Sequence, residues 1–71
     1  GSGVERRAGE LVDRAVTEGI ANGRNPVGVA AACLYTAARE RDADCTQRDA
    51  ADAAGVTPVT VRRTYVELTA E

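Results

Sequence analysis

Residues Thr46–Leu68 read "TQRDAADAAGVTPVTVRRTYVEL", an order of residue types that is typical of two short helices joined by a tight turn. The opening threonine, with Asp49 three residues later, indicates a capping box at the start of a helix of about two turns, which ends at Gly55. Thr57 is the expected N-cap of the second helix, with Pro58 at its first position. Two helices separated by about three residues that include glycine predict a helix-turn-helix.

The two helices of this pair differ in character. The first has a small-residue surface suited to close packing, formed by Ala50, Ala51, Ala53 and Ala54. In the second, a rotation of about 100° per residue places Val61, Tyr65 and Leu68 on one side, which is the predicted core side. The opposite side, predicted to be exposed, carries Val59, Arg62, Arg63 and Val66. Because arginine can donate two hydrogen bonds to guanine and a small apolar side chain can contact a base edge, this face is typical of a recognition helix in a DNA major groove.

Groups that can hold phosphate gather near the N-termini of the same two helices, where backbone N–H groups also point outward. They are Thr46, Gln47, Arg48, Thr57 and Thr60. Within residues 46–68, however, three arginines are balanced by three carboxylates. General electrostatic attraction to DNA should therefore be weak, and a plain helical bundle with surface arginines is the competing interpretation.

The rest of the chain predicts two further helices and no strand. Apolar residues recur at helical spacing over Val4–Glu18, and Gly19 is placed to end that helix in a left-handed conformation. Asn25 and Pro26 are the expected N-cap and first residue of the next helix, which is apolar on every side as far as Ala38. A helix without a polar face belongs at the centre of a domain. We expect it to contact the other helices through Ala31, Leu34, Tyr35 and Ala38.

Composition limits the classes of protein. The 71 residues are enough for one small domain, with nine basic residues, all arginine, and eleven acidic residues. Two explanations account equally well for the use of arginine in place of lysine: codon bias and a salt-adapted source. There is no apolar run of about 18 residues and no charged leader, so we expect a cytoplasmic protein without a membrane span. Residues 1–3, "GSG", read as an expression scar.

Cysteine and histidine usage argues against a metal site and against catalysis. Cys33 and Cys45 are the only cysteines and histidine is absent, so no metal and no cofactor is predicted. Both are expected to be free thiols, Cys33 in the core and Cys45 in a polar loop. No nucleophile has a neighbouring base and no glycine-rich loop can hold a phosphate, so the chain is not expected to be an enzyme.

The quoted stretch, together with "GRNPVGVAAACLYTAARE" at residues 23–40, resembles the second cyclin-like repeat of archaeal transcription factor B, the counterpart of eukaryotic transcription factor IIB. The most specific parts are Gly-x-x-Pro-x-Gly-x-Ala-Ala-Ala, Thr-Gln-Arg, and Gly-Val-Thr-x-Val-Thr-Val-Arg before Tyr65. The resemblance implies an all-α, cyclin-like helical bundle over residues 4–71, with the helix-turn-helix at 46–68. The family's repeat has five helices, of which about four are expected here.

The resemblance also implies a function. It is sequence-specific promoter DNA binding in transcription initiation, in which helix 58–68 reads the factor B recognition element, a purine- and GC-rich box just upstream of TATA. The family's base-reading valine and arginine fall on Val59 and Arg62. The residues expected to support backbone contacts are Thr46, Gln47, Arg48, Thr57, Thr60 and Arg63. The implied partners are promoter DNA, TATA-binding protein and, through other parts of the full-length protein, RNA polymerase, in association with the archaeal nucleoid.

Some residues depart from the family's pattern. Pro58 stands where an acidic residue is common, and Arg63 stands where a neutral polar residue is common. The first helix of the repeat, the first repeat and the N-terminal zinc ribbon are expected to lie outside this sequence, which bears on contacts with TATA-binding protein and polymerase. The alternative is a cyclin-like protein interaction module that does not touch DNA. Substitutions on the face of Val59 and Arg62 distinguish the two.

Overall fold

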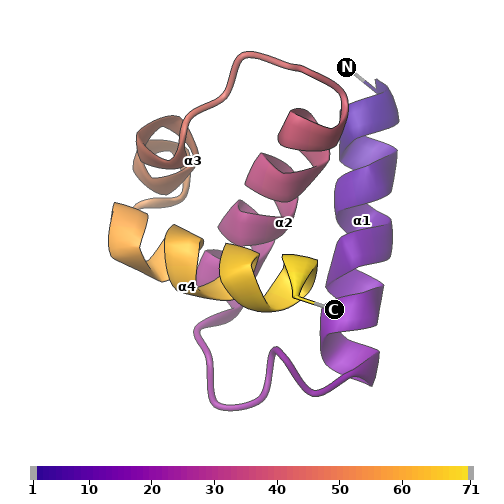
Figure 1. Ribbon diagram of the computed structural model, residues 1–71. Helices are drawn as coiled ribbons and strands as arrows, with labels where there is room; N and C mark the ends of the chain where they lie inside the picture. The colour runs from indigo at the N-terminus through magenta and orange to yellow at the C-terminus, as the bar shows by residue number, and fades with distance from the viewer. Residues whose placement is uncertain (1, 71) are drawn as a thin grey trace.

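A computed structural model describes residues 2–70, which form four helices and no strand. Helix α1 (Ser2–Thr17) lies beside α2 (Pro26–Glu40), and α4 (Pro58–Thr69) crosses α2 next to the short α3 (Gln47–Ala54) (Figure 1). Helix α2 contacts all three other helices, and α3 also contacts α4. The predicted all-α bundle with a central helix is therefore confirmed. Among the described residues, no helix has both the length and the apolar character needed to span a bilayer.

Helix α1 follows the prediction closely, with a shift at each end. It begins at Ser2 rather than Val4, so part of the segment that we interpreted as an expression scar is helical, while Gly1 lies outside the described residues. Gly19 has a φ of +79°, the left-handed conformation expected at the end of this helix. Ile20 then packs against the core. The chain therefore turns toward α2 where the glycine allows it.

Helix α2 is the most buried element. Its predicted start is confirmed, because the Asn25 side chain accepts a hydrogen bond from the backbone N–H of Val27 at 2.9 Å and Pro26 is the first helical residue. Nine of its fifteen residues are buried. Cys33 is completely buried, as predicted, and desolvation raises the pKa of its thiol to about 11.

One expectation about α2 is wrong. Ala31, Tyr35 and Ala38 are buried, but Leu34 is 36% exposed. Leu34 lies on a stripe with Ala30, about one turn before it, and Val27, about two turns before it, both of which are also exposed. An apolar sequence shows only that a helix can be covered on all sides. In residues 2–70 the other three helices leave this stripe in contact with solvent.

The C-terminal end of α2 uses a residue other than glycine in the left-handed region. Asp42 has a φ of +54°, and the backbone N–H of Ala43 donates to the carbonyl oxygen of Ala38 at 2.8 Å. This hydrogen-bond pattern closes a helix end by satisfying one of its last carbonyl groups. Aspartate is among the few residues with a side chain that occupy this conformation at moderate cost.

Helices α3 and α4 are joined by the short turn at residues 55–57. Thr46 and Asp49 form the capping box, with hydrogen bonds of 3.0 Å in both directions. Gly55 ends α3 with a φ of +71°, and the N–H of Val56 donates to the carbonyl oxygen of Ala51 at 3.0 Å. Thr57 caps α4 through the backbone N–H of Thr60 at 3.3 Å.

The alanines of α3 divide between core and solvent. Ala50 and Ala51 are buried and Ala54 is half-buried against the core, but Ala53 is exposed, so it lies outside the packing surface that we expected. A helix of eight residues can turn only part of its circumference toward its neighbours.

The junction between α2 and α4 fixes the position of α4. Gly28 is buried, and a Cβ placed on it would lie 2.7 Å from the Cγ2 atom of Thr60, so the two helices approach more closely there than a side chain permits. Farther along, the rings of Tyr35 and Tyr65 meet edge to face with centroids 5.1 Å apart. The guanidinium carbon of Arg39 lies 5.8 Å from each of the two ring centroids.

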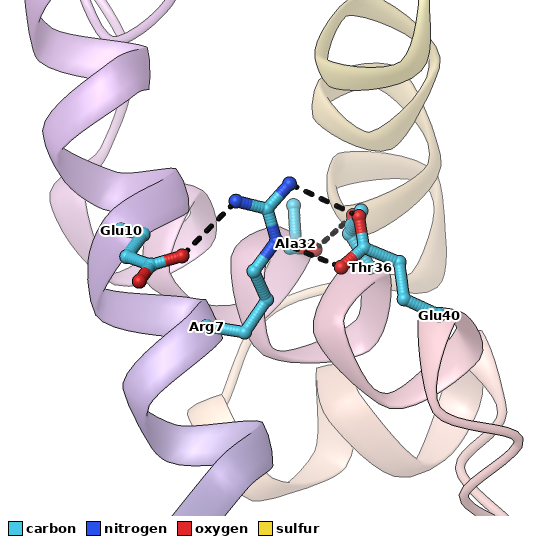
Figure 2. Close-up of polar contacts among 5 residues, drawn as sticks. All are labelled: Arg7, Glu10, Ala32, Thr36 and Glu40. Atoms are coloured by element: carbon cyan, nitrogen blue, oxygen red, sulfur yellow. Dashed lines mark hydrogen bonds and ion pairs between the residues drawn. The ribbon is translucent and has the colours of Figure 1, made fainter.

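The junction between α1 and α2 carries an ion-pair cluster near its surface (Figure 2). Arg7 donates from Nε to Glu40 at 2.8 Å and from Nη1 to Glu10 at 3.2 Å. The hydrogen bond from Arg7 holds the pKa of the Glu40 carboxyl below its usual value. Nearby, the buried hydroxyl of Thr36 donates to the carbonyl oxygen of Ala32 at 2.7 Å, which satisfies a polar group inside the core.

Candidate nucleic-acid interface

Helix α4 has the two faces that its sequence predicts. Val61 and Leu68 are buried and Tyr65 is half-buried against the core. Thr64 is also buried on this side, which the sequence reasoning missed because threonine does not count as apolar in a helical pattern. The helix is therefore held to the domain by one face along its length.

The opposite face of α4 is exposed. Val59 and Val66 have 57% and 51% of their surface in contact with solvent, and Arg62 and Arg63 are exposed beside them. The four residues line one surface hollow, together with Arg24 from the loop between α1 and α2. Two apolar side chains between cationic side chains can contact base edges while the guanidinium groups donate hydrogen bonds. The structure thus brings together the two predicted base-reading residues, Val59 and Arg62.

The residues predicted to support backbone contacts lie near the N-termini of α3 and α4, but they differ in availability. Thr46, Arg48 and Thr57 are exposed, whereas Gln47 and Thr60 are half-buried. Both exposed threonines already accept a hydrogen bond from a backbone N–H of the helix that they cap. Their side chains therefore stabilise the helix starts. Because Pro58 has no N–H, the backbone groups that remain suited to phosphate are the N–H groups of Gln47 and Arg48 on α3 and of Val59 on α4.

Thr60 has a packing role that the sequence reasoning did not anticipate. Its methyl group lies against Gly28, and its hydroxyl oxygen is 3.1 Å from the hydroxyl oxygen of Thr57. The side chain is thus engaged on both sides within the domain. We therefore regard Thr60 as a residue that sets the position of α4.

Arg24 is the residue of this surface that sequence reasoning missed. Its Nη1 donates to the hydroxyl of Thr64 at 3.4 Å, and its Nη2 forms an ion pair with Glu67, so it ties the loop to α4. A helical pattern carries no information about a loop residue, because the loop's path depends on tertiary packing. The sequence feature that could have pointed to Arg24 was its place in the "GRNP" stretch.

Comparisons with known proteins agree with this architecture. A family model described as "Transcription factor TFIIB repeat" matches residues 1–71. The chain is 59% identical over 66 residues to "Transcription initiation factor IIB 1" of Halobacterium salinarum, in an alignment that covers 93% of this chain and 23% of the relative. It is 61% identical over 59 residues to "Transcription initiation factor IIB 5" of the same organism, with 83% and 19% covered.

A more distant relative gives the same picture. "Transcription initiation factor IIB" of Saccharolobus shibatae is 46% identical over 68 residues, which is 96% of this chain and 22% of that protein. The chain thus spans about a fifth of the length of these curated relatives.

Proposed function

Because the chain belongs to the transcription factor TFIIB repeat family, a family of transcription factors and not of enzymes, we propose that it acts in transcription initiation as a module that binds promoter DNA. In this proposal, α4 enters the major groove at the purine- and GC-rich box upstream of TATA. The single observation that carries it is the exposed face of α4, where two valines and two arginines stand together on a helix whose other face is buried.

The residues of this face have different roles in the proposal. Arg62 donates to the O6 and N7 atoms of a guanine, and Val59, nearly one turn earlier, lies against a base edge. Arg63 is turned about 100° from Arg62 and contacts a phosphate. The N-termini of α3 and α4, with Arg48 beside the first, hold phosphates on either side of the groove.

The charge of the domain sets its affinity. Because arginines and carboxylates balance within residues 46–68, we expect the isolated domain to bind a promoter duplex only with a Kd of about 10⁻⁴ to 10⁻⁶ M. TATA-binding protein bound next to the box would raise the effective concentration of the domain there. Contacts with TATA-binding protein and RNA polymerase belong to the proposed activity of a full-length protein.

The decisive experiment compares variants on two duplexes, one with the box and one with the same bases scrambled. Arg62→Ala should weaken binding to the box duplex by about 1 to 3 kcal/mol and have little effect on the scrambled duplex. Arg63→Ala, the matched control on the same face, should weaken both alike. Equal losses on both duplexes for Arg62→Ala would make it a phosphate contact and refute base reading.

Val59→Asp tests the face as a whole. A carboxylate there should abolish preference for the box through repulsion from the DNA, while circular dichroism stays unchanged because Val59 is exposed. Loss of helical content in this variant would show that Val59 is needed for folding, and would refute the assignment of this face of α4 to DNA recognition.

A second candidate rests on the exposed stripe of α2. Val27, Ala30 and Leu34 form an apolar strip without a charged residue among them, which suits a protein helix better than DNA. If the domain is an interaction module, its partner should still bind the Val59→Asp variant and should fail to bind a Leu34→Asp variant.

A further inference from the structure

Arg24 occupies an unusual place for a loop residue, because its side chain contacts three residues and connects the loop between α1 and α2 with α4. Its Nε donates to the carbonyl oxygen of Ile20 at 2.9 Å, within the same loop. Its two terminal nitrogens reach α4, where Nη1 donates to Thr64 at 3.4 Å and Nη2 pairs with Glu67. The guanidinium group is thus held at a fixed position beside α4, and little side-chain entropy remains to be lost when it binds a further group.

The guanidinium group of Arg24 retains binding capacity. It has five N–H groups, and the contacts in the described part of the chain engage three of them, so two remain on the terminal nitrogens. Its side chain is 31% exposed. It lines the hollow formed with Val59, Arg62, Arg63 and Val66, and also a second hollow on the side of Asn25 and Thr60. Arg24, with two donors uncommitted, therefore lines the same hollow as the exposed face of α4.

We propose that Arg24 is a further DNA-contacting residue, which binds a backbone phosphate at the edge of the groove that α4 enters. The assignment rests on the proposed function and extends the interface from the helix-turn-helix to the loop between α1 and α2. Arginine suits this role because its planar fork can give two hydrogen bonds to one phosphate. The contact carries no base preference, since it is made to the backbone.

Glu67 competes with the phosphate in this arrangement. Its carboxylate pairs with Arg24 and is itself 47% exposed, so it repels an anion that approaches the same guanidinium group. Removing its charge should therefore strengthen DNA binding through Arg24. If the Arg24–Glu67 pair served only to orient α4, removing the charge of Glu67 would weaken DNA binding. The two roles therefore predict opposite changes in DNA affinity.

The test measures binding of the whole chain to the box and scrambled duplexes at several salt concentrations. Arg24→Gln should weaken binding to both duplexes alike and lower the slope of log K against log salt by about one unit. Between about 50 and 200 mM salt, the wild-type affinity should then fall about threefold more than that of the variant. Arg24→Lys keeps the charge and should retain the wild-type slope.

The chain offers a matched control in a second arginine–glutamate pair. Arg14 and Glu18, on α1 and just after it, form an ion pair of 2.9 Å with side-chain exposures of 38% and 49%, similar to those of Arg24 and Glu67. Arg14→Gln and Glu18→Gln change the net charge by the same amounts at another site. Both should leave the salt slope within experimental error of the wild type.

The sign test uses Glu67→Gln alone and in combination. Glu67→Gln should raise the affinity for both duplexes by about twofold to threefold, and this gain should disappear in an Arg24→Gln background. Circular dichroism and thermal unfolding confirm that each variant is folded.

Two results overturn the assignment separately from the proposed function. An unchanged salt slope in Arg24→Gln, or weaker binding in Glu67→Gln, would show that Arg24 only positions α4, while the preference for the box would still support the proposed function. Conversely, equal affinity of the wild type for both duplexes with a reduced slope in Arg24→Gln would keep the phosphate contact and refute sequence reading. Absence of binding to either duplex at low salt would refute both.

Discussion

The two junctions that α2 makes, with α4 and with α1, are stabilised in different ways. The junction with α4 is built from buried small residues, the edge-to-face rings of Tyr35 and Tyr65, and the buried side chains of Val61 and Leu68. The junction with α1 shares this apolar interior but ends in an exposed cluster of Arg7, Glu10 and Glu40. Apolar packing has no charge to screen or titrate, whereas exposed ion pairs are screened by salt and lost when the carboxylate is protonated at low pH. The orientation of α4 therefore depends on the part of the domain that solution conditions affect least.

The largest expected effect comes from the buried end of α4. Leu68→Ala should lower the free energy of unfolding by about 2 to 5 kcal/mol, because Leu68 is only 2% exposed and its truncation leaves a cavity. Leu34→Ala, the same chemical change on the exposed stripe of α2, should cost no more than about 1 kcal/mol. Urea unfolding followed by circular dichroism measures both. Similar losses for the two leucines would show that the stripe is covered in solution.

The close approach of α2 and α4 gives the next effect. Gly28→Ala should destabilise the domain by about 1 to 3 kcal/mol, because the new methyl group would overlap Cγ2 of Thr60 and the hydrogen bond to Thr57 limits rotation of that side chain. Thr60→Ser removes Cγ2 and keeps the hydroxyl. In that background, Gly28→Ala should become neutral or stabilise by up to about 1 kcal/mol, since alanine favours helix. A loss of equal size in both backgrounds would contradict the contact.

The ion-pair cluster between α1 and α2 should contribute less. The folded-state pKa of Glu40 is lowered from 4.5 by its hydrogen bond with Arg7, so the stabilisation is present above about pH 4.5 and is lost as the pH falls through the folded value. Because both side chains are more than a third exposed, the loss should stay below about 1 kcal/mol. Stability measured from pH 6 to pH 3 in the wild type and Glu40→Gln tests this. Identical pH profiles would show that the pair is not formed in solution.

The smallest expected effect is at the end of α2. Asp42→Gly should raise the free energy of unfolding by about 0.5 kcal/mol, because glycine occupies the left-handed region without the steric cost that aspartate bears. Asp42→Ala is the matched control and should lower it, since alanine lacks the polar side chain that eases this conformation. A gain for both variants would point to the removed charge instead.

What could be predicted from the sequence was set by local chemistry. The three N-caps, the capping box, the left-handed conformation of Gly19 and the helix end at Gly55 each depend on residues within one turn of one another. The two faces of α4 followed from its period, and Val59 and Arg62 are exposed as expected. These features required no knowledge of how the helices meet.

What could not be predicted depends on tertiary packing. The exposure of Leu34 is set by which helices cover α2, and a sequence that is apolar all round does not reveal a side that remains uncovered. Arg24 joins the surface of α4 only because the loop folds back to Thr64 and Glu67, about 40 residues later. The left-handed Asp42 lacked the glycine that would have signalled it.

Because Cys33 is buried, the rate at which its thiol is modified can report how often the domain unfolds. At neutral pH a thiol with a pKa of about 11 is ionised in only about one molecule in ten thousand, and its sulfur is shielded from solvent by the surrounding helices. A thiol-alkylating reagent should therefore modify Cys33 only after α2 has separated from its neighbours, whereas Cys45, half-buried in the loop before α3, reacts from the folded state. Mass spectrometry over time would show one fast and one slow addition. The slow rate would report how often this small domain opens completely, without any introduced label.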